Sequence, residues 1–236
     1  MLSNFTFQSL ENQLNLAKQN GYQFITCAEF VKEKKSLNSK TIVHRVDIDA
    51  SPKKAERLCY IFESLGIKAT FFVRLHAAEY NPFSFENYRI LKGIAAAGHE
   101  IGYHSEVVDQ QAIWNEDATD CLKRDLAVLN EMLGVKVKGV ASHGGLTGLN
   151  NLDFWKNRDP SDFGLLYEAY DETEAFGLFK NSFYISDSEW YRWKCYDNGE
   201  LIPGDNRSLA EHLSNNHPLI YLLIHPDTYY DKHIYE

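Results

Sequence analysis

The sequence has no apolar run long enough to cross a bilayer and no extended run of basic residues. Its longest apolar stretches, residues 93–98 and 218–224, fall far short of the roughly 20 residues that span a membrane as a helix. The net charge is −9, from 24 Lys and Arg against 33 Asp and Glu, and basic residues gather only in the short segment 32–35. We therefore expect no membrane span and no nucleic-acid partner.

Cysteine is scarce and scattered. The four cysteines, Cys27, Cys59, Cys121 and Cys195, form no C-x-x-C pair. This spacing argues against a cysteine zinc knuckle and against a dense disulfide framework. The amino terminus has neither the basic start nor the continuous apolar core of a secretory signal. These absences together predict reduced, buried thiols in a cytoplasmic protein.

The chain also lacks any internal repeat, low-complexity tract or Pro/Gly/Ser-rich linker that would divide it. With 236 residues, of which 44% are hydrophobic and 24% charged, it can bury a full core. We expect a single domain over residues 1–236. A helical extension is expected over about residues 1–40, and the main body over about residues 41–236.

Short β-branched or apolar segments alternate with segments of helical periodicity. The expected helices cover residues 7 to about 20, 52–65, 84–97 and 117–133, and the expected strands cover residues 41–49, 69–73, 100–104, 137–141, 183–186 and 219–224. The second helix has Ser51-Pro52 at its start and Gly66 at its end, both typical boundary signals. Such alternation predicts parallel strands joined by crossover helices.

Polar residues that can bind a metal follow several of these strands. They are Asp47 and Asp49 after the first, His104 after the third, His143 after the fourth and His225 after the last. Active sites in barrels and open α/β sheets are built at the carboxyl ends of the strands. We therefore expect these side chains to converge on one rim.

Asp47 and Asp49 are two residues apart, so on an extended strand both side chains point the same way, together with Arg45. Two carboxylates on one face repel each other. A metal cation would relieve the repulsion by binding one carboxylate, while the other stays free to accept a proton. The alternative is an ordinary salt bridge from Arg45 to Asp47, with Asp49 capping the helix that follows.

The three histidines differ in local context. His104 ends an apolar strand, and His143 precedes two glycines that would let the backbone approach a bound group or would simply form a turn. His225 closes the apolar run 220–224, which suits a general acid, although a strand-end histidine bonded to a loop carbonyl is the alternative. We assign structural roles, in surface-like polar contexts for the last three, to His99, His212, His217 and His233.

In these motifs the sequence resembles a divergent branch of the NodB-like polysaccharide deacetylases, carbohydrate esterase family 4. Residues 45–49 (RVDID) are similar to the family's first motif, residues 98–105 (GHEIGYHS) to its second and residues 222–225 (LLIH) to its last. The resemblance runs in the right order from about residue 41 to residue 226. It implies an α/β fold, the distorted (β/α) barrel of the NodB type.

The resemblance also implies roles for four residues. Asp47 matches the catalytic base, Asp49 and His104 match metal ligands, and His225 matches the catalytic acid. Each of the four stands at its motif position in this sequence.

The sequence departs from the family at one metal ligand. The second motif normally has another histidine four residues after the first, and here that position is Val108. His143 is the first candidate to replace it, with Glu106 and Asp109 as alternatives; loss of the metal is the other possibility. Two imidazoles and one carboxylate suit zinc, and mixed nitrogen and oxygen ligands also admit other divalent metals.

Supporting residues are expected around the same rim. The segment 184–190 is expected to supply Asp187, which would orient a catalytic partner, and Trp190, which would stack on a sugar; Trp193 is the alternative platform. Arg45 and Glu106 are the other supporting candidates.

Together these features predict a metal-dependent hydrolase that removes an acetyl group from an N-acetylated sugar or glycan precursor in the cytoplasm. The expected substrate is a small molecule or an oligosaccharide. Two alternatives stay open. One is hydrolysis of another C–N bond, as in a cyclic amide or imide, and the other is a catalytically silent carbohydrate-binding protein.

Overall fold

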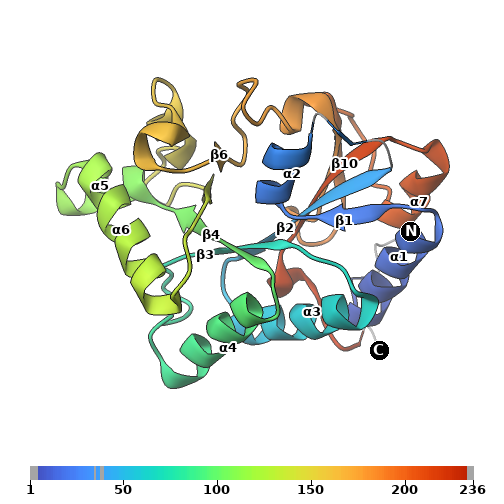
Figure 1. The fold of residues 1–236 in the computed structure, drawn as a ribbon, viewed down its shortest axis with the longest axis horizontal. Helices are drawn as coiled ribbons and strands as arrows, with labels where there is room; N and C mark the ends of the chain where they lie inside the picture. Colours follow the sequence, from blue (N-terminus) through green and yellow to red (C-terminus); the bar gives the residue numbers. More distant parts are fainter. Residues whose placement is uncertain (1–4, 35, 38–39, 233–236) are drawn as a thin grey trace.

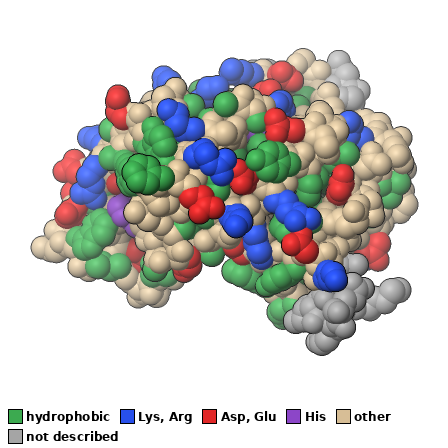
Figure 2. All heavy atoms as spheres, turned by 90° about the horizontal axis from the view of Figure 1, so that it is seen from below, with side chains coloured by type: hydrophobic (Ala, Val, Ile, Leu, Met, Phe, Trp, Pro, Cys, Tyr) green, Lys and Arg blue, Asp and Glu red, His purple; other side chains and the backbone are tan. Residues whose placement is uncertain are grey.

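The computed structural model describes residues 5–34, 36–37 and 40–232. His233 lies outside these residues. Within the described ranges, none of the helices has the length and apolar character needed to cross a membrane. Figure 2 shows Lys and Arg side chains interspersed with Asp and Glu over the face seen from below.

A ten-stranded sheet runs through the described part of the chain (Figure 1). Its strand order is β6-β5-β4-β3-β2-β10-β7-β8-β9, with β1 paired to β2 off this path. The strands are β1 (Gln23–Ile25), β2 (Thr41–Ile48), β3 (Thr70–Val73), β4 (Glu100–Ser105), β5 (Gly139–Ser142), β6 (Tyr167–Glu168), β7 (Phe183–Ser186), β8 (Lys194–Asp197), β9 (Glu200–Leu201) and β10 (Leu219–Ile224).

The strands from β6 to β7 along this path are all parallel, and β8 and β9 are antiparallel additions beyond β7. No pairing among the described residues joins β6 to β7, so the barrel is open on that side. The predicted parallel α/β architecture is confirmed.

Helices follow one another around the outside of the sheet, and α1, α3, α4 and α6 lie along its outer side in Figure 1. The helices are α1 (Phe7–Gln19), α2 (Cys27–Glu33), α3 (Pro52–Leu65), α4 (Phe85–Ala96), α5 (Val107–Trp114), α6 (Ala118–Leu133) and α7 (Leu209–His212). The boundary signals of α3 act as expected. The Ser51 side chain accepts a hydrogen bond from the Lys54 N–H, and Gly66 ends the helix with φ 63°.

Strand β2 shows how the two sides of the sheet are built. Ile42 and Val46 belong to the outer core under the helices, whereas Val43 belongs to a second core inside the barrel. Because side chains alternate along a strand, Arg45 and Asp47 share the inner side with Val43. The apolar outer positions thus fix the direction in which the polar inner positions point.

The first 40 residues contribute more than helices. Strand β1 lies between α1 and α2 and pairs in parallel with β2, so this segment joins the main sheet. The division into an extension and a main body near residue 41 stays a prediction.

Several elements escaped the sequence analysis. Helix α5 has its apolar side chains at residues 107, 108 and 112–114, two adjacent runs that do not form the regular stripe of an amphipathic helix. Strands β1, β6 and β9 have only two or three residues each, too few for a recognisable alternation.

The described histidines that were assigned structural roles are more buried than expected. His212 is fully buried, with its ring 4.6 Å from that of Phe183, and His217 stacks on the same ring at 3.8 Å. The surface-like context assigned to His212 is therefore wrong, because side chains from β7, β8 and the loop after β9 contact its ring. All four cysteines are buried and unpaired, as predicted.

Two buried histidines give the outer core a dependence on pH. His44 and His99 both pack against the Phe62 ring, at 4.7 and 5.9 Å. Burial lowers the pKa of His44 to about 3 and that of His99 to about 4. The ring nitrogens of His44 have no hydrogen-bond partner among the described residues, so protonation in the folded state is unfavourable.

We expect stability to fall as the pH drops from about 6.5 towards 4. In this range the unfolded histidines bind protons and the folded ones do not, which costs up to about 1.4 kcal/mol per pH unit for each residue. Urea unfolding between pH 7 and pH 4.5 measures this slope. His44→Leu should flatten it relative to wild type, and an unchanged slope in that variant would contradict the assignment.

Candidate active site

Four strand ends converge around the carboxylate of Asp49, which directly follows β2. Its Oδ1 lies 3.3 Å from Nε2 of His104 and 3.9 Å from Nε2 of His143. Its Oδ2 lies 3.9 Å from Nε2 of His225. The side chains arrive from β2, β4, β5 and β10, as the rule about strand ends predicts.

Asp49 offers an unsatisfied ligand atom. Its Oδ1 is buried and makes no hydrogen bond to any described residue. Burial alone would raise the pKa of Asp49, but the imidazoles of His104, His225 and His143 lower it well below its usual range. A buried, ionised oxygen without a donor is rare in folded proteins, and a cation at this point would satisfy it. The residues present therefore fit a divalent metal.

His104 is held in the orientation that a metal ligand needs. Its Nδ1 lies 2.8 Å from the carbonyl oxygen of Ala141. When Nδ1–H donates there, Nε2 is left with its lone pair, which faces the carboxylates of Asp47 and Asp49 at 3.3 Å each. Burial alone would lower the pKa of His104, but these two carboxylates raise it. The position thus favours a positive charge.

His143 is fixed by its own backbone. Its N–H donates to the Ser105 carbonyl at 2.9 Å, and its carbonyl accepts from the Asn151 side chain at 3.1 Å. The ring stands nearly perpendicular to that of His104, at 5.1 Å between centroids. This places a second imidazole beside Asp49, where Val108 leaves the family's ligand position without one.

The two carboxylates proposed as alternatives lie differently. Oε1 of Glu106 is 3.3 Å from Nδ1 of His143, on the side of that ring away from Asp49. Asp109 accepts hydrogen bonds from the N–H groups of Leu146 and Thr147 and from the Asn151 side chain. Asp109 therefore holds the loop that carries His143, whereas Glu106 is placed to orient its ring.

Asp47 forms the salt bridge that the sequence offered as an alternative. Nε and Nη2 of Arg45 donate to its two oxygens at 2.8 and 2.7 Å, and both residues are buried. Burial alone would raise the pKa of Asp47, but the charges of Arg45 and His104 lower it. The salt bridge and the place on the rim coexist, so Asp47 is an ionised carboxylate beside the His104 ring.

His225 is paired with Asp187, which follows β7. Its Nδ1 lies 2.6 Å from Oδ1 of Asp187, and its backbone N–H donates to the same carboxylate at 3.0 Å. Burial alone would lower the pKa of His225, but Asp187 raises it to about 9. The imidazole therefore carries a proton on Nε2 at neutral pH, on the side that faces Asp49.

Trp190 and Trp193 differ in solvent exposure. Trp190 lies on the loop after β7 with 53% of its surface exposed, whereas Trp193 is 2% exposed and packs against the Phe5 ring at 5.5 Å. The alternative assignment of Trp193 as a sugar platform is therefore wrong, because that ring fills the outer core.

Arg74, which directly follows β3, is a rim residue that the sequence patterns did not predict. It donates to the backbone carbonyl of Asp49 through Nη1 and to Oε1 of Glu106 through Nη2, both at 2.8 Å. Its burial matches that of Glu106, so the pair shares a low-dielectric setting. The sequence did contain a signal for it. Among the first four predicted strands, only the strand at residues 69–73 had no polar rim residue assigned to its end, and residue 74 directly follows that strand.

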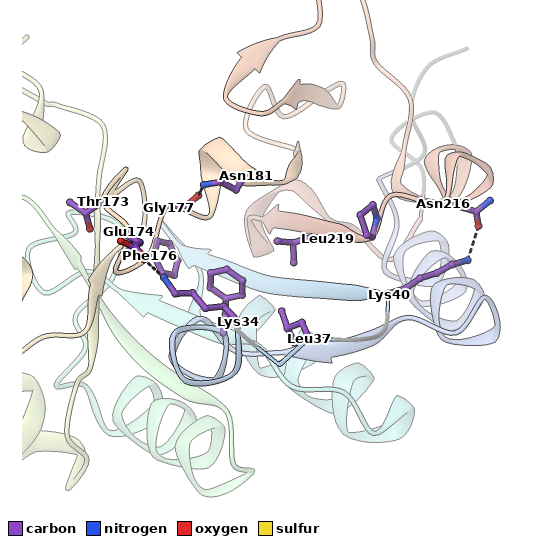
Figure 3. A pocket seen from close by; sticks show the side chains of 12 residues that line it. Lys34, Leu37, Lys40, Thr173, Glu174, Phe176, Gly177, Asn181, Asn216 and Leu219 are labelled. Atoms are coloured by element: carbon purple, nitrogen blue, oxygen red, sulfur yellow. Dashed lines mark hydrogen bonds between the residues drawn. The ribbon is translucent and has the colours of Figure 1, made fainter.

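A cavity lies away from the rim, at the amino ends of β2 and β10 (Figure 3). It encloses about 760 Å³, and its lining includes Phe30, Lys34, Lys40, Phe176 and Leu219. The described residues that line it include none of the rim cluster.

We expect Arg74→Met to destabilise the protein by about 3–5 kcal/mol, because it leaves the Glu106 carboxylate buried without its cation. Adding Glu106→Gln should recover most of this loss. Urea unfolding in the presence of a chelator measures both effects without a bound metal. The control is Arg89→Met, which removes an ion pair from a largely exposed arginine and should cost less than about 1 kcal/mol. Equal losses for Arg74→Met and Arg89→Met would contradict the prediction.

The sequence of this chain matches the model of a known protein family. The model of the polysaccharide deacetylase family matches residues 34–153, about half of the chain. A search of curated proteins gives no match.

Among solved structures, a carbohydrate esterase family 4 (CE4) esterase from Streptococcus mutans is 15% identical, with a TM-score of 0.52 over 90% of this chain and 83% of that one. A family 4 carbohydrate esterase from Bacillus anthracis is 16% identical, with a TM-score of 0.45 over 91% and 89% of the two chains.

A CE4 pseudoenzyme from Bacillus anthracis is 16% identical, with a TM-score of 0.46 over 80% of this chain and 56% of that one. Two variants of a CE4 pseudoenzyme are likewise longer, and this chain spans 57% and 58% of their length. The expected NodB-type fold is confirmed by the shared architecture. With the family model matched over about half of its residues, this chain belongs to the polysaccharide deacetylases, carbohydrate esterase family 4.

Proposed function

We propose that this protein is a metal-dependent hydrolase that removes an acetyl group from an N-acetylated sugar or glycan precursor. The observation that carries the proposal is the buried Oδ1 of Asp49, which has no hydrogen-bond partner among the described residues yet lies within 4 Å of two imidazole nitrogens. Family membership supports the reaction class.

Asp49, His104 and His143 would hold a divalent metal. One carboxylate and two imidazoles form a donor set that zinc accepts in hydrolytic sites. When bound, the metal would supply Lewis acidity to the acetyl carbonyl and to the attacking water. Arg74 would hold Asp49 in place through the backbone carbonyl of that residue. Glu106 would orient the His143 ring through Nδ1.

Asp47 is the proposed general base. Its contact with His104 supports this role, because the carboxylate lies 3.3 Å from a proposed ligand and so borders the place where the attacking water would lie. Arg45 keeps the carboxylate ionised and fixes both of its oxygens. Water gives a proton to Asp47, and its oxygen bonds to the acetyl carbon.

His225 is the proposed general acid. Asp187 holds the ring through Nδ1 and raises its pKa to about 9, so the Nε2 proton is present at neutral pH. As the C–N bond breaks, this proton passes to the departing nitrogen, which leaves as the amine of the sugar while the acyl group leaves as acetate. Exposed Trp190 would stack on the sugar ring, as aromatic faces at binding sites do.

One observation favours a second candidate function, a catalytically silent carbohydrate-binding protein. Val108 stands where the family has a metal-binding histidine, and a metal site without its third ligand would lose affinity. Hydrolysis of a cyclic amide or imide is the remaining alternative, and a substrate panel separates it from deacetylation.

We expect zinc-loaded protein to release acetate from N-acetylglucosamine, from its oligomers or from a nucleotide-linked N-acetyl sugar. Asp49→Ala and His225→Ala should each lower kcat by about 10²- to 10⁴-fold, because each removes charge stabilisation or proton transfer at the reacting centre. His217→Gln, which lies away from the rim, is the matched control and should keep full activity. Undiminished turnover in Asp49→Ala would overturn the mechanism, and binding of these sugars without acetate release would favour the silent protein.

Metal content tests the ligand set directly. We expect His104→Ala and His143→Ala each to bind one equivalent of zinc fewer than wild type, measured by elemental analysis after dialysis against zinc. Glu106→Gln should weaken zinc binding by about 10- to 100-fold, as loss of an orienting partner does. Full metal retention in His143→Ala would instead assign the third ligand to Glu106.

A further inference from the structure

A second group of side chains that could bind a metal lies away from the rim, next to β7. Cys195 comes from β8, Asp205 from the loop after β9 and His212 from the end of α7. Nε2 of His212 is 3.4 Å from Sγ of Cys195 and 3.4 Å from Oδ2 of Asp205. One ligand atom from each residue lies within 4.8 Å of the other two.

The group is closed to solvent. Cys195 and His212 have no exposed surface, and the Asp205 side chain is 6% exposed. Burial raises the pKa of the Cys195 thiol to about 12, so the sulfur is neutral unless a cation replaces its proton. Structural zinc sites are closed in this way, whereas catalytic ones keep an open position.

Three of the distances in this group are close to edges of a zinc tetrahedron. With Zn–S near 2.3 Å and Zn–N and Zn–O near 2.1 Å, a tetrahedral site has edges of about 3.6 Å from S to N, about 3.4 Å from N to O and about 3.6 Å from S to O. The first two correspond to the contacts of His212. The third corresponds to the backbone carbonyl of Arg207, which lies 3.6 Å from Sγ of Cys195.

We propose that Cys195, Asp205 and His212 form a second, structural metal site that takes zinc, with the Arg207 carbonyl as the fourth donor. It uses sulfur, nitrogen and oxygen together, whereas the rim offers only nitrogen and oxygen. Binding forms a bond from the metal to Sγ and releases the thiol proton to solvent. The site is independent of the proposed activity at the rim.

Outer partners that fix the ligands are already in place. Nε of Arg207 donates to Oδ1 of Asp205 at 3.0 Å, and Nη2 donates to Oδ2 at 2.7 Å. Each oxygen keeps a second lone pair. The amide of Asn215 lies 3.3 Å from Nδ1 of His212. With the amide turned so that its oxygen faces Nδ1, it would accept Nδ1–H and leave Nε2 free for a metal.

The site would brace the strand that leads to the active site. Cys195 is paired across the sheet with Ile185 of β7, and β7 ends at Ser186, directly before Asp187. His212 packs on Phe183 of the same strand. A metal here would join β8, the loop after β9 and α7 to one another, and β8 is itself hydrogen-bonded to β7.

Cobalt substitution separates the two sites, because only the second contains sulfur. We expect Co²⁺ added under reducing conditions to give a thiolate-to-cobalt charge-transfer band in the near ultraviolet. The band should appear in wild type and in His104→Ala, and it should be absent from Cys195→Ala. Cys59→Ala, which removes another buried thiol, is the control and should keep it. Elemental analysis should find one equivalent of zinc in His104→Ala.

Absence of the band from His104→Ala at saturating Co²⁺ would overturn the second site, and this result needs no folded Cys195 variant. An unchanged zinc content in folded Cys195→Ala would overturn it as well, and would leave the three side chains as a hydrogen-bonded group. If wild type binds a single equivalent that His104→Ala retains and Cys195→Ala loses, the second site stands and the proposed metal-dependent activity fails.

Discussion

The negative charge of Asp47 and Asp49 on one side of a buried strand is the constraint around which the rim is organised. In a low-dielectric interior such charges are far more costly than in water unless they are compensated. Arg45 binds Asp47 through two hydrogen bonds, and His104 lies 3.3 Å from both carboxylates. One oxygen of Asp49 is still without a partner among the described residues. The described residues therefore neutralise Asp47 fully and Asp49 only in part.

At the position of Val108 the family has a histidine, and in this chain the neighbouring strand brings an imidazole to the rim instead. In the family pattern both histidines come from one motif, whereas here α5 begins at Val107 and Val108 is partly buried against the outer core. The β4–β5 register pairs His104 with Ala141, which places His143 beside it. Parallel strands bring residues that are 39 positions apart to one rim, so an imidazole from the next strand reaches this rim without a change of fold.

Charged pairs with different degrees of burial have different roles in this structure. Arg45–Asp47 and Arg74–Glu106 are almost completely shielded from water, and they orient groups at the rim. Exposed pairs such as Arg89–Glu56 contribute little because solvent screens them. The inner side of the barrel thus concentrates its polar groups at the carboxyl ends, and the aromatic core below them provides the low dielectric that strengthens each contact.

Much of the frame could be predicted from local patterns. The main strands and helices, the Ser51 and Gly66 boundaries of α3 and the convergence of Asp49, His104, His143 and His225 all follow from periodicity, cap residues and the geometry of parallel strands. The pattern was insufficient for α5 and for the two- and three-residue strands, where too few side chains repeat. It was misleading for Trp193 and His212, because an aromatic or polar stretch looks the same whether a distant segment covers it or not.

The sequence by itself determined which residues form the rim, since residue types at strand ends carry that information. Only the tertiary structure decided which partner each polar group takes. Arg74 reaches Glu106 and the Asp49 carbonyl, Asp187 pairs with His225, and Cys195 meets His212. These contacts depend on strand register and on loops of irregular pattern that fold over the sheet. The physical reason is that periodicity specifies the direction of a side chain within its own element, whereas hydrogen bonding and burial are set by residues that come close only after the chain has folded.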